Sequence, residues 1–471
     1  MNLKYIFLLY ILSLTLKDCI SNAVDRCFCK LNESVDDCSC PVTDLEDYNT
    51  KIYPILQSLL VKDYFRYFKI NLNRECPFWV DDSRCALRDC HVKGCGPKEI
   101  PKGLQEDDPV YIEHQKSKYF GTPNIVHHPE CLDENHGGLG NLDISISQTQ
   151  KEVMHNWTIY DDQQDNFCEI DDENANGATY VDLTKNPERF TGYMGKSAHR
   201  IWNSIYKENC FNEHRNKYGI NLHDAEYLGF LNVIDREQCL EKRIFYRIIS
   251  GLHTSISIHL CREYLLKDKT GFGSPQWGPN VTEFAKRFDP KFEKDGPQRL
   301  KNLFFTYLVE LRAIAKVADY LSEDQFYTGD EVDDRETRLA VKHFLTQVKN
   351  FTNHFDEQKL FKGDPKEAKK LKHEFVQHFR NITRIINCVG CDKCKLWGTL
   401  QVKGMGTALK ILFTNPATPE KASADKDSFT KISSKFQLTR TEIVALFNAF
   451  GRLSTSVHSL SLFKDLMKDW L

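Results

Sequence analysis

Cysteine is the residue that most constrains how this chain can fold. The sequence holds 17 cysteines in 471 residues, and several stand in tight clusters such as Cys27-Phe28-Cys29 and Cys38-Ser39-Cys40. They are too few for a mini-scaffold built on disulfides alone, yet too clustered for ordinary buried thiols. Their role therefore depends on whether the chain folds in a reducing or an oxidising compartment.

The N-terminal residues predict an oxidising compartment. Lys4 precedes an apolar run from Tyr5 to Leu16, and Ser21-Asn22-Ala23 has the small side chains of a signal-cleavage site. The run of about 12 residues is shorter than the roughly 20 that span a bilayer, although a signal anchor stays an alternative. We expect a signal peptide over 1–23, whose removal takes Cys19 with it and leaves an even 16 cysteines, which favours disulfides.

Five glycosylation sequons agree with entry into the secretory pathway. They begin at Asn32, Asn156, Asn280, Asn350 and Asn381. We find no later segment long and apolar enough to cross a membrane, so we expect the mature protein to be lumenal or secreted.

Composition and periodicity predict a helical protein with a substantial core. The net charge of −3 gives no sign of nucleic-acid binding, and 41% of the residues are hydrophobic. Length alone predicts two to three domains. However, apolar residues recur at helical spacing in Tyr48–Lys69, Leu300–Leu311 and Ile443–Phe450, whereas strand-like alternation is scarce.

We therefore predict a mainly α-helical single domain over 24–471. An N-terminal knot would be stapled by its two cysteine pairs, with Cys27 joined to Cys40 and Cys29 joined to Cys38. A long mobile loop that bears cysteines is expected at about 81–150, where Gly, Pro and acidic residues interrupt the periodicity.

The sharpest cysteine motif is Cys388-Val389-Gly390-Cys391-Asp392-Lys393-Cys394. Two cysteines three apart at a helix start can close a redox-active disulfide, and the helix N-terminus or a nearby lysine lowers the pKa of one thiol. Zinc is an alternative, but a structural zinc site needs four ligands, and only three cysteines with no paired histidines stand here. Inert structural disulfides are a third possibility.

A second group comprises Cys76, Cys85, Cys90 and Cys95. Cys85 and Cys90 sit among basic residues, so a dithiol on a flexible arm could carry electrons between an outside partner and a buried site. Loop staples are the alternative, and we prefer it for Cys76. A relay also needs a two-electron acceptor, but the sequence has no haem motif and Gly404-Met405-Gly406 lacks the third glycine of a dinucleotide fingerprint.

Five motifs follow one another along the chain: Cys76-Pro77-Phe78-Trp79, Cys85-x4-Cys90, Asn186-Pro187-Glu188-Arg189-Phe190-Thr191-Gly192-Tyr193, Ile249-Ser250-Gly251-Leu252-His253 and Cys388-x2-Cys391-x2-Cys394. In this order they resemble the endoplasmic oxidoreductins, the FAD-dependent thiol oxidases that supply disulfides to protein disulfide isomerase. The resemblance covers residues 27 to 465 or so and implies a single helical domain around a flavin.

The resemblance also implies roles for most cysteines. Cys391 and Cys394 would form the active-site disulfide beside the flavin, and Cys85 and Cys90 the shuttle pair that takes electrons from the isomerase. Structural bridges would join Cys76 to Cys388 and Cys210 to Cys239, in addition to the N-terminal pairs. A regulatory exchange would pair Cys85 with Cys131 and Cys90 with Cys95. Cys168 and Cys261 are expected to be free or weakly engaged.

The FAD contacts implied by the resemblance are Arg189, Thr191, Trp202, Ser250, His253, Arg287 and Arg299. Arginines suit the pyrophosphate and a tryptophan can stack on a flat ring. Taken singly, Trp202 is more typical of a core residue, and Arg287 and Arg299 of surface charges.

The implied activity transfers electrons from reduced isomerase to FAD and then to molecular oxygen, which yields hydrogen peroxide. We expect the protein in the endoplasmic reticulum lumen. Lys468-Asp469-Trp470-Leu471 is no retrieval signal, so retention would require a partner or peripheral association with the lumenal face of the membrane. The rival hypotheses are a disulfide-rich binding protein whose cysteines are all static, and a zinc-stapled lumenal module.

Overall fold

The computed structural model describes the ordered core of the chain. The described residues are 45–76, 78–79, 90–105, 177–188, 193, 196–209, 240–262, 278–349, 357, 360–361, 365–413 and 438–468, together with the backbone of 26–29 and 38–44.

Helices make up most of the described chain, as predicted. They are α2 (Val42–Leu60), α3 (Asp63–Arg66), η1 (Lys102–Leu104), α6 (Lys196–Lys207), α9 (Leu240–Leu260), α10 (Val281–Phe288), α11 (Gly296–Lys316), α12 (Ala318–Ser322), α13 (Glu331–Lys349), α14 (Pro365–Ile386), α15 (Asp392–Phe413) and α16 (Arg440–Lys468). The strands are β1 (Arg26–Cys29), β2 (Cys38–Pro41), β3 (Tyr67–Ile70) and β4 (Thr179–Asp182). They form two antiparallel pairs, β1 with β2 and β3 with β4.

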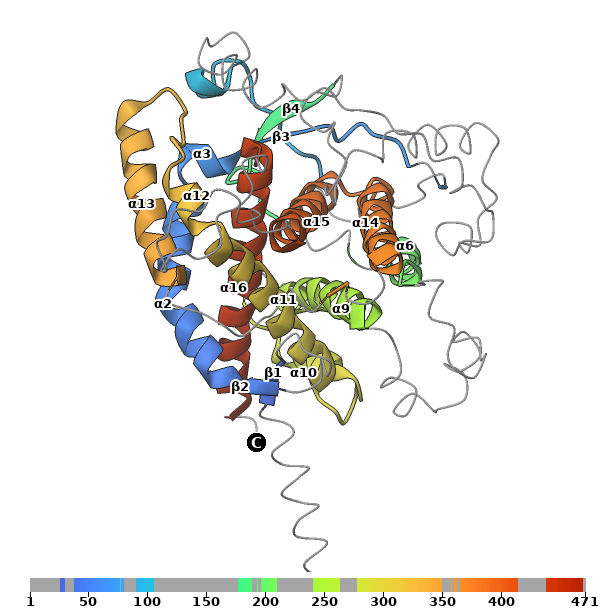
Figure 1. Ribbon diagram of the computed structural model, residues 1–471. Helices are drawn as coiled ribbons and strands as arrows, with labels where there is room; N and C mark the ends of the chain where they lie inside the picture. The colour runs from blue at the N-terminus through green and yellow to red at the C-terminus, as the bar shows by residue number, and fades with distance from the viewer. Residues whose placement is uncertain are drawn as a thin grey trace, which may run out of the picture.

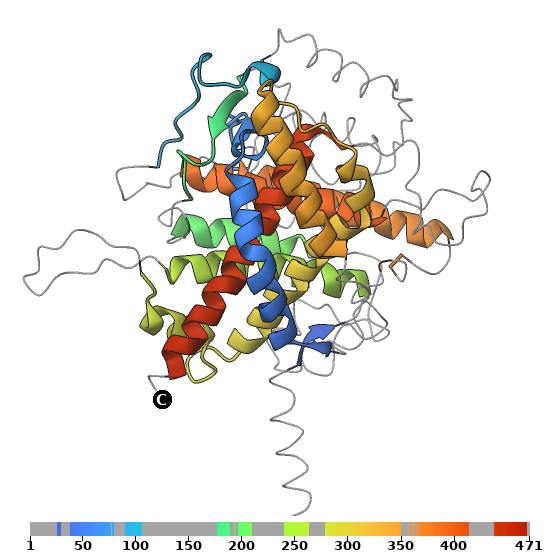
Figure 2. The ribbon, with the colours of Figure 1, turned by 90° about the vertical axis from the view of Figure 1, so that its left-hand side faces the viewer.

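Four helices that lie roughly side by side enclose the candidate site. Figure 1 shows α6, α9, α14 and α15 on one side of the molecule, and Figure 2, turned by 90°, shows them running in similar directions. α16 crosses this group and packs on α15, α9 and α2. One apolar cluster extends through these helices and through α11, so the site is built on the core and not on surface loops.

Two helix crossings depend on glycines that allow close backbone approach. A Cβ atom placed on Gly251 of α9 would lie 2.4 Å from the Asn302 carbonyl oxygen of α11. One on Gly404 of α15 would lie 2.5 Å from the Ala445 carbonyl oxygen of α16. Gly404-Met405-Gly406 lies within α15, and the helix crossing accounts for Gly404 without a nucleotide-binding turn.

The helical segment predicted over Tyr48–Lys69 is interrupted in the structure. α2 ends at Leu60, the four-residue α3 follows, and the chain then enters β3. All four residues of Tyr67–Ile70 are buried, so the strand shows no alternation of apolar and polar residues. A short, fully buried strand cannot be told from a buried helix turn by periodicity, which is why the sequence pattern missed it.

The N-terminal knot is a β-hairpin in its backbone. The register of β1 and β2 sets Cys29 opposite Cys38 and Phe28 opposite Cys40. The side chains of Cys27, Cys29, Cys38 and Cys40 lie outside the described residues, so the two predicted bridges stay predictions. Most of the long loop predicted at 81–150 also lies outside them; only 90–105 is described.

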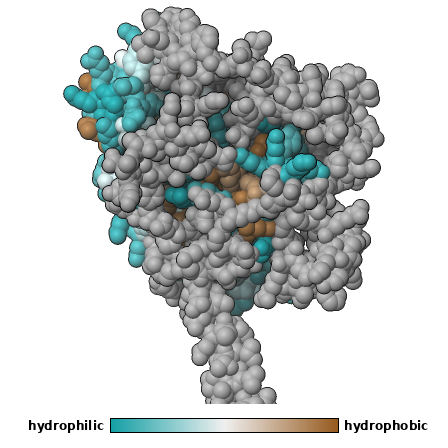
Figure 3. Space-filling view, in the orientation of Figure 1, coloured by the Kyte–Doolittle hydropathy of each residue, from teal (hydrophilic) through white to brown (hydrophobic). Residues whose placement is uncertain are grey.

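Apolar side chains come into view at the centre of the face shown in Figure 3. In the part of the chain that the structure describes, no helix combines the length and the apolar character needed to cross a bilayer.

The α15–α16 crossing gives a first prediction. Gly404→Ala should lower the free energy of unfolding by about 1–3 kcal/mol, because the added methyl group meets Ala449 Cβ at 2.3 Å in a well-packed interface. Chemical denaturation followed by far-UV circular dichroism measures the change.

Gly398→Ala is the matched control on the same helix, since its Cβ would meet only Ile386 Cγ2 at an ordinary 3.4 Å. Alanine improves helix propensity by up to about 1 kcal/mol at both positions, so the control should be neutral or stabilised. Equal behaviour of the two variants would contradict the close crossing.

Candidate functional site

A disulfide between Cys391 and Cys394 stands at the amino end of α15. Cys391 directly precedes the helix, Cys394 lies in its first turn, and both are buried, at 3% and 0% exposure. The Cys394 backbone N–H donates to Cys391 Sγ at 3.3 Å. An N–H group at a helix N-terminus stabilises negative charge, so on reduction this position favours the thiolate form of Cys391.

The third cysteine of the motif, Cys388, is bonded to Cys76. This bridge joins positions 312 residues apart and holds the turn between α14 and α15 against the segment that follows β3. All three cysteines of the motif are therefore in disulfides, and none is left as a thiolate ligand for zinc. Among the described residues no group of three or more His, Cys, Asp and Glu side chains could hold a metal ion.

The segment that begins at Cys90 docks on the residues between the two active-site candidates. The Lys393 N–H donates to the Cys90 carbonyl oxygen at 2.9 Å, and His91 Nδ1 lies 3.1 Å from Asp392 Oδ2. The Cys90 carbonyl thus satisfies one of the free N–H groups that begin α15. Cys90 is itself buried and disulfide-bonded, and its predicted partner Cys85 lies outside the described residues.

We call the segment from Cys90 to Cys95 the arm. Asn186 of the Asn-Pro-Glu-Arg motif holds this arm at Lys93. Its side chain accepts from the Lys93 N–H at 2.7 Å and donates to the Lys93 carbonyl at 2.9 Å. Its own carbonyl accepts from Trp397 Nε1 of α15 at 2.8 Å. Cys95, two residues after Lys93, is a free thiol. Its pKa is raised by burial and, to a smaller extent, by the nearby carboxylates of Asp182 and Glu99.

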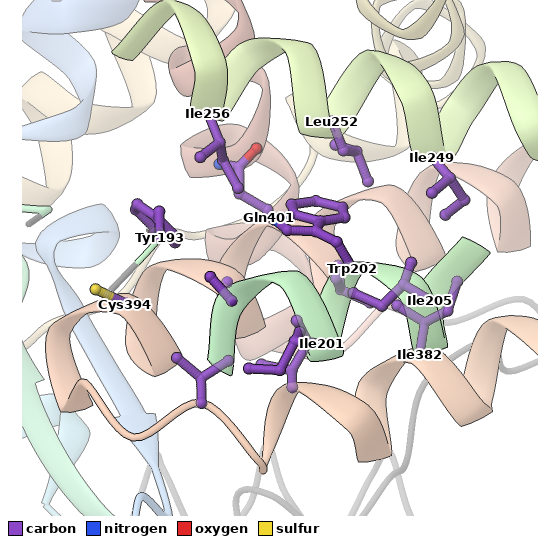
Figure 4. Close-up of a pocket in the computed structure, with 15 residues that line it drawn as sticks. Tyr193, Ile201, Trp202, Ile205, Ile249, Leu252, Ile256, Ile382, Cys394 and Gln401 are labelled. Atoms are coloured by element: carbon purple, nitrogen blue, oxygen red, sulfur yellow. The ribbon is translucent and has the colours of Figure 1, made fainter. Parts of the chain in front are cut away.

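An apolar pocket opens beside Cys394, enclosed by α6, α9, α14 and α15 (Figure 4). The empty space between its lining atoms, open solvent included, is about 630 Å³. Isoleucine, leucine and valine side chains make most of its wall. Tyr193, Trp202, Cys394 and Gln401 supply the aromatic, sulfur and amide groups that line the rest. Cys394, one of the two cysteines of the disulfide, therefore borders a space lined mostly by apolar side chains.

Two of the predicted FAD contacts meet at the edge of this pocket. Trp202 of α6 stacks on His253 of α9 with ring centroids 3.8 Å apart, and the Tyr206 hydroxyl lies 2.9 Å from His253 Nδ1. Burial, and next the charges of Arg299 and Arg287, lower the pKa of His253 to about 3. His253 is therefore neutral at physiological pH, and the two arginines place positive charge near it.

The remaining predicted contacts are partly engaged within the protein. Ser250 Oγ accepts from Asn302 Nδ2 at 2.9 Å, Arg299 Nη2 donates to Ser257 Oγ at 3.0 Å, and Arg287 pairs with Glu283 at 2.6 Å. Arg189 and Thr191 lie outside the described residues, as do Cys131, Cys168, Cys210 and Cys239. Cys261 is a free, buried thiol, as expected, and burial raises its pKa to about 12.

Two of the five sequons are described. Asn280 caps α10, where its side chain accepts from the Glu283 N–H at 3.0 Å. Asn381 lies within α14 and donates to the buried Glu208 carboxylate at 3.0 Å. Asn32, Asn156 and Asn350 lie outside the described residues.

A buried ion pair that the sequence did not reveal anchors the segment above the pocket. Arg452 Nε of α16 lies 2.5 Å from Glu188 Oε2, and both side chains are 6% exposed. The Tyr193 hydroxyl donates to Glu188 Oε1 at 2.9 Å, and His259 Nε2 lies 3.3 Å from Oε2. Because burial lowers the pKa of His259 well below its usual value, Arg452 supplies the countercharge. Glu188 thereby holds Tyr193 over the pocket.

This anchor gives a second prediction. Glu188→Ala should lower the free energy of unfolding by about 3–5 kcal/mol, because it leaves the Arg452 charge buried without its partner. The double variant Glu188→Ala/Arg452→Met should recover most of the loss, since it removes both charges. Urea unfolding of the wild type, of Glu188→Ala, of Arg452→Met and of the double variant measures the coupling. Losses that simply add would contradict a buried pair.

Known proteins that resemble this chain in sequence belong to one family. A family profile described as Endoplasmic Reticulum Oxidoreductin 1 (ERO1) matches residues 51–460. The chain is 49% identical to an Ero1-like protein of Drosophila melanogaster over 94% of its own length and 91% of the relative's. It is 45% identical to ERO1-like protein alpha of Homo sapiens, over 95% and 93% of the two chains.

Solved structures are similar as well. A double mutant of S. cerevisiae Ero1p aligns with a TM-score of 0.56 and 30% identity, over 91% of this chain and 98% of that chain. A structure of Ero1p described as the source of disulfide bonds for oxidative protein folding in the cell aligns with a TM-score of 0.54 and 31% identity, over 91% and 99% of the two chains.

Proposed function

The chain belongs to the endoplasmic reticulum oxidoreductin family, and from this premise we propose that it is a lumenal thiol oxidase that generates disulfides de novo. Its electron donor would be reduced protein disulfide isomerase, its cofactor FAD, and its final acceptor molecular oxygen. The observation that carries the proposal is the docking of Cys90 on the two residues between Cys391 and Cys394, beside an apolar pocket lined by Cys394.

The residues around the pocket fit a flavin. A flavin ring is flat and mostly apolar with one polar edge, and the pocket combines aliphatic walls, the aromatic Trp202 and one amide side chain, Gln401. Arg287 and Arg299 provide positive charge near His253, which suits a pyrophosphate. Trp202, Ser250, His253, Arg287 and Arg299 would hold the cofactor, together with Arg189 and Thr191. When bound, FAD supplies the two-electron acceptor and passes the electrons to oxygen, which yields hydrogen peroxide.

The cysteines would carry the electrons in two thiol–disulfide exchanges. A thiolate of the reduced isomerase attacks the Cys85–Cys90 disulfide, and its second thiol then resolves the mixed disulfide, which leaves the isomerase oxidised and the pair reduced. The reduced pair attacks the Cys391–Cys394 disulfide in the same way. Each exchange breaks one S–S bond, forms another and moves two electrons.

The burial of both disulfide sulfurs explains why a relay is needed. Cys391 and Cys394 are almost inaccessible, so a folded protein substrate cannot reach them directly. Cys90 is also buried, and its docking on Lys393 would be the inner position of the relay. The outer position requires the arm to leave α15, which breaks the Lys393–Cys90 hydrogen bond and the His91–Asp392 contact.

The two sulfurs of the active-site pair would divide the work. Cys391 Sγ accepts a hydrogen bond from the Cys394 N–H, and this bond would stabilise a thiolate at Cys391. Cys391 would therefore be the leaving group when the disulfide opens. Cys394 lines the pocket and faces the proposed cofactor site.

We also propose the endoplasmic reticulum lumen as the location, with peripheral association at the membrane face. Regulation would exchange Cys85 onto Cys131 and Cys90 onto Cys95.

Oxygen consumption by two cysteine variants tests the electron path. Cys394→Ala should reduce thiol oxidation to background with every substrate, because the step next to the pocket is lost. Cys85→Ala should lose oxidation of the isomerase but keep oxidation of a small dithiol that reaches the inner pair. Equal losses with both substrates would contradict the relay, and an inert wild type would favour a static disulfide-rich binding protein.

The docking contact gives a separate prediction. Asp392→Asn and His91→Gln should each slow isomerase-driven turnover by up to about fivefold, the effect of losing an exposed polar pair worth up to about 1 kcal/mol. Turnover of a small dithiol should stay unchanged. Lys464→Gln removes another exposed ion pair, with Glu46, far along the chain, and it is the matched control. Similar slowing in the control, or slowing with both substrates, would contradict a docking role.

A further inference from the structure

The side chain of Gln401 is an unpaired polar group in an apolar wall. Gln401 lies on α15 and is 5% exposed, and both its amide oxygen and its amide nitrogen are buried without a hydrogen-bond partner among the described residues. It lines the pocket beside Cys394, and Figure 4 shows its amide directed toward Ile256 of α9. Buried amides in folded proteins nearly always find partners, so these two atoms at one pocket are suited to bind a polar group of a ligand.

The placement of Gln401 on α15 relates it to the disulfide. Cys394, Gly398 and Gln401 are separated by four and three residues, so they share one face of the helix. Gly398 contributes no side chain between the other two, and all three line the pocket. The helix therefore presents a sulfur at one end of a bare strip and an amide about 10 Å further along the axis.

The other polar groups of the pocket do not offer the same capacity. The Tyr193 hydroxyl already donates to Glu188, and Cys394 is held in its disulfide. An indole such as that of Trp202 can only donate. Among the lining residues that the structure describes, Gln401 alone combines a buried, unpaired donor with a buried, unpaired acceptor.

We propose that the Gln401 amide binds the polar imide edge of the flavin ring and fixes the orientation of the ring beside Cys394. This inference rests on the proposed function. The imide edge presents alternating C=O and N–H groups, and a primary amide pairs with two adjacent ones through one donated and one accepted hydrogen bond. The N–H group of Gln401 also stabilises the negative charge that this edge gains when the ring is reduced.

A binding titration with FAD tests the proposal on the purified full chain and its flavin-free form. Gln401→Met keeps the length and bulk of the side chain and removes both hydrogen bonds. Its affinity for FAD should fall roughly tenfold, its bound-flavin absorption band should shift, and the reduction potential of the flavin should become more negative. The flavin-free variant should be as stable as the wild type or more stable, because an unpaired buried amide is gone.

Gln377→Met is the matched control, since Gln377 lies on α14 and does not line the pocket. Its affinity, band position and potential should equal those of the wild type. If Gln401→Met has the same affinity, band position and potential as a wild type that binds FAD, the role of Gln401 is overturned and the proposed function stands. Lower stability of the flavin-free variant would overturn it in favour of a packing role. A wild type that binds no FAD would remove the proposed function and this inference together.

Discussion

The hydrogen bond from the Lys393 N–H to the Cys90 carbonyl oxygen is the contact on which the rest of the site depends. It satisfies one of the free N–H groups at the amino end of α15, and it brings the arm to the two residues that separate Cys391 from Cys394. The N–H group of Cys394 at the same helix end donates to Cys391 Sγ, so one local feature both docks the arm and would favour the proposed exchange at this disulfide.

The core around α15 insulates the proposed electron acceptor from solvent. α9, α14 and α6 surround the pocket, while the crossing of α15 with α16 at Gly404 fixes the helix from behind. Glu188 and Arg452 tie the segment that carries Tyr193 to α16 across 264 residues of sequence. The scaffold is thus well packed where a ring would be held, and the proposed relay would move only the arm.

Much of this organisation could be predicted from the sequence because it is local. The spacing of Cys388, Cys391 and Cys394 and the helical periodicity are both short-range signals, and the mainly helical fold is confirmed. β3 was missed because a fully buried strand has no alternation. The Glu188–Arg452 pair and the amide of Gln401 give no sequence signal of their own, since one unites distant charges and the other is a single glutamine in an apolar helix. The pairing of Cys76 with Cys388 came only from family resemblance, because many cysteines allow many connectivities.

The central claim is that electrons from an outside dithiol reach an acceptor in the α15 pocket through the cysteine relay. Anaerobic rapid mixing of the purified protein with an excess of fully reduced isomerase, followed by visible absorbance, tests it. A flavin band should bleach as the isomerase becomes oxidised, with up to three dithiols consumed per flavin reduced, one for the flavin and one for each of the two relay disulfides. A protein without a visible band, or one whose band stays unchanged while the isomerase is oxidised, would contradict it.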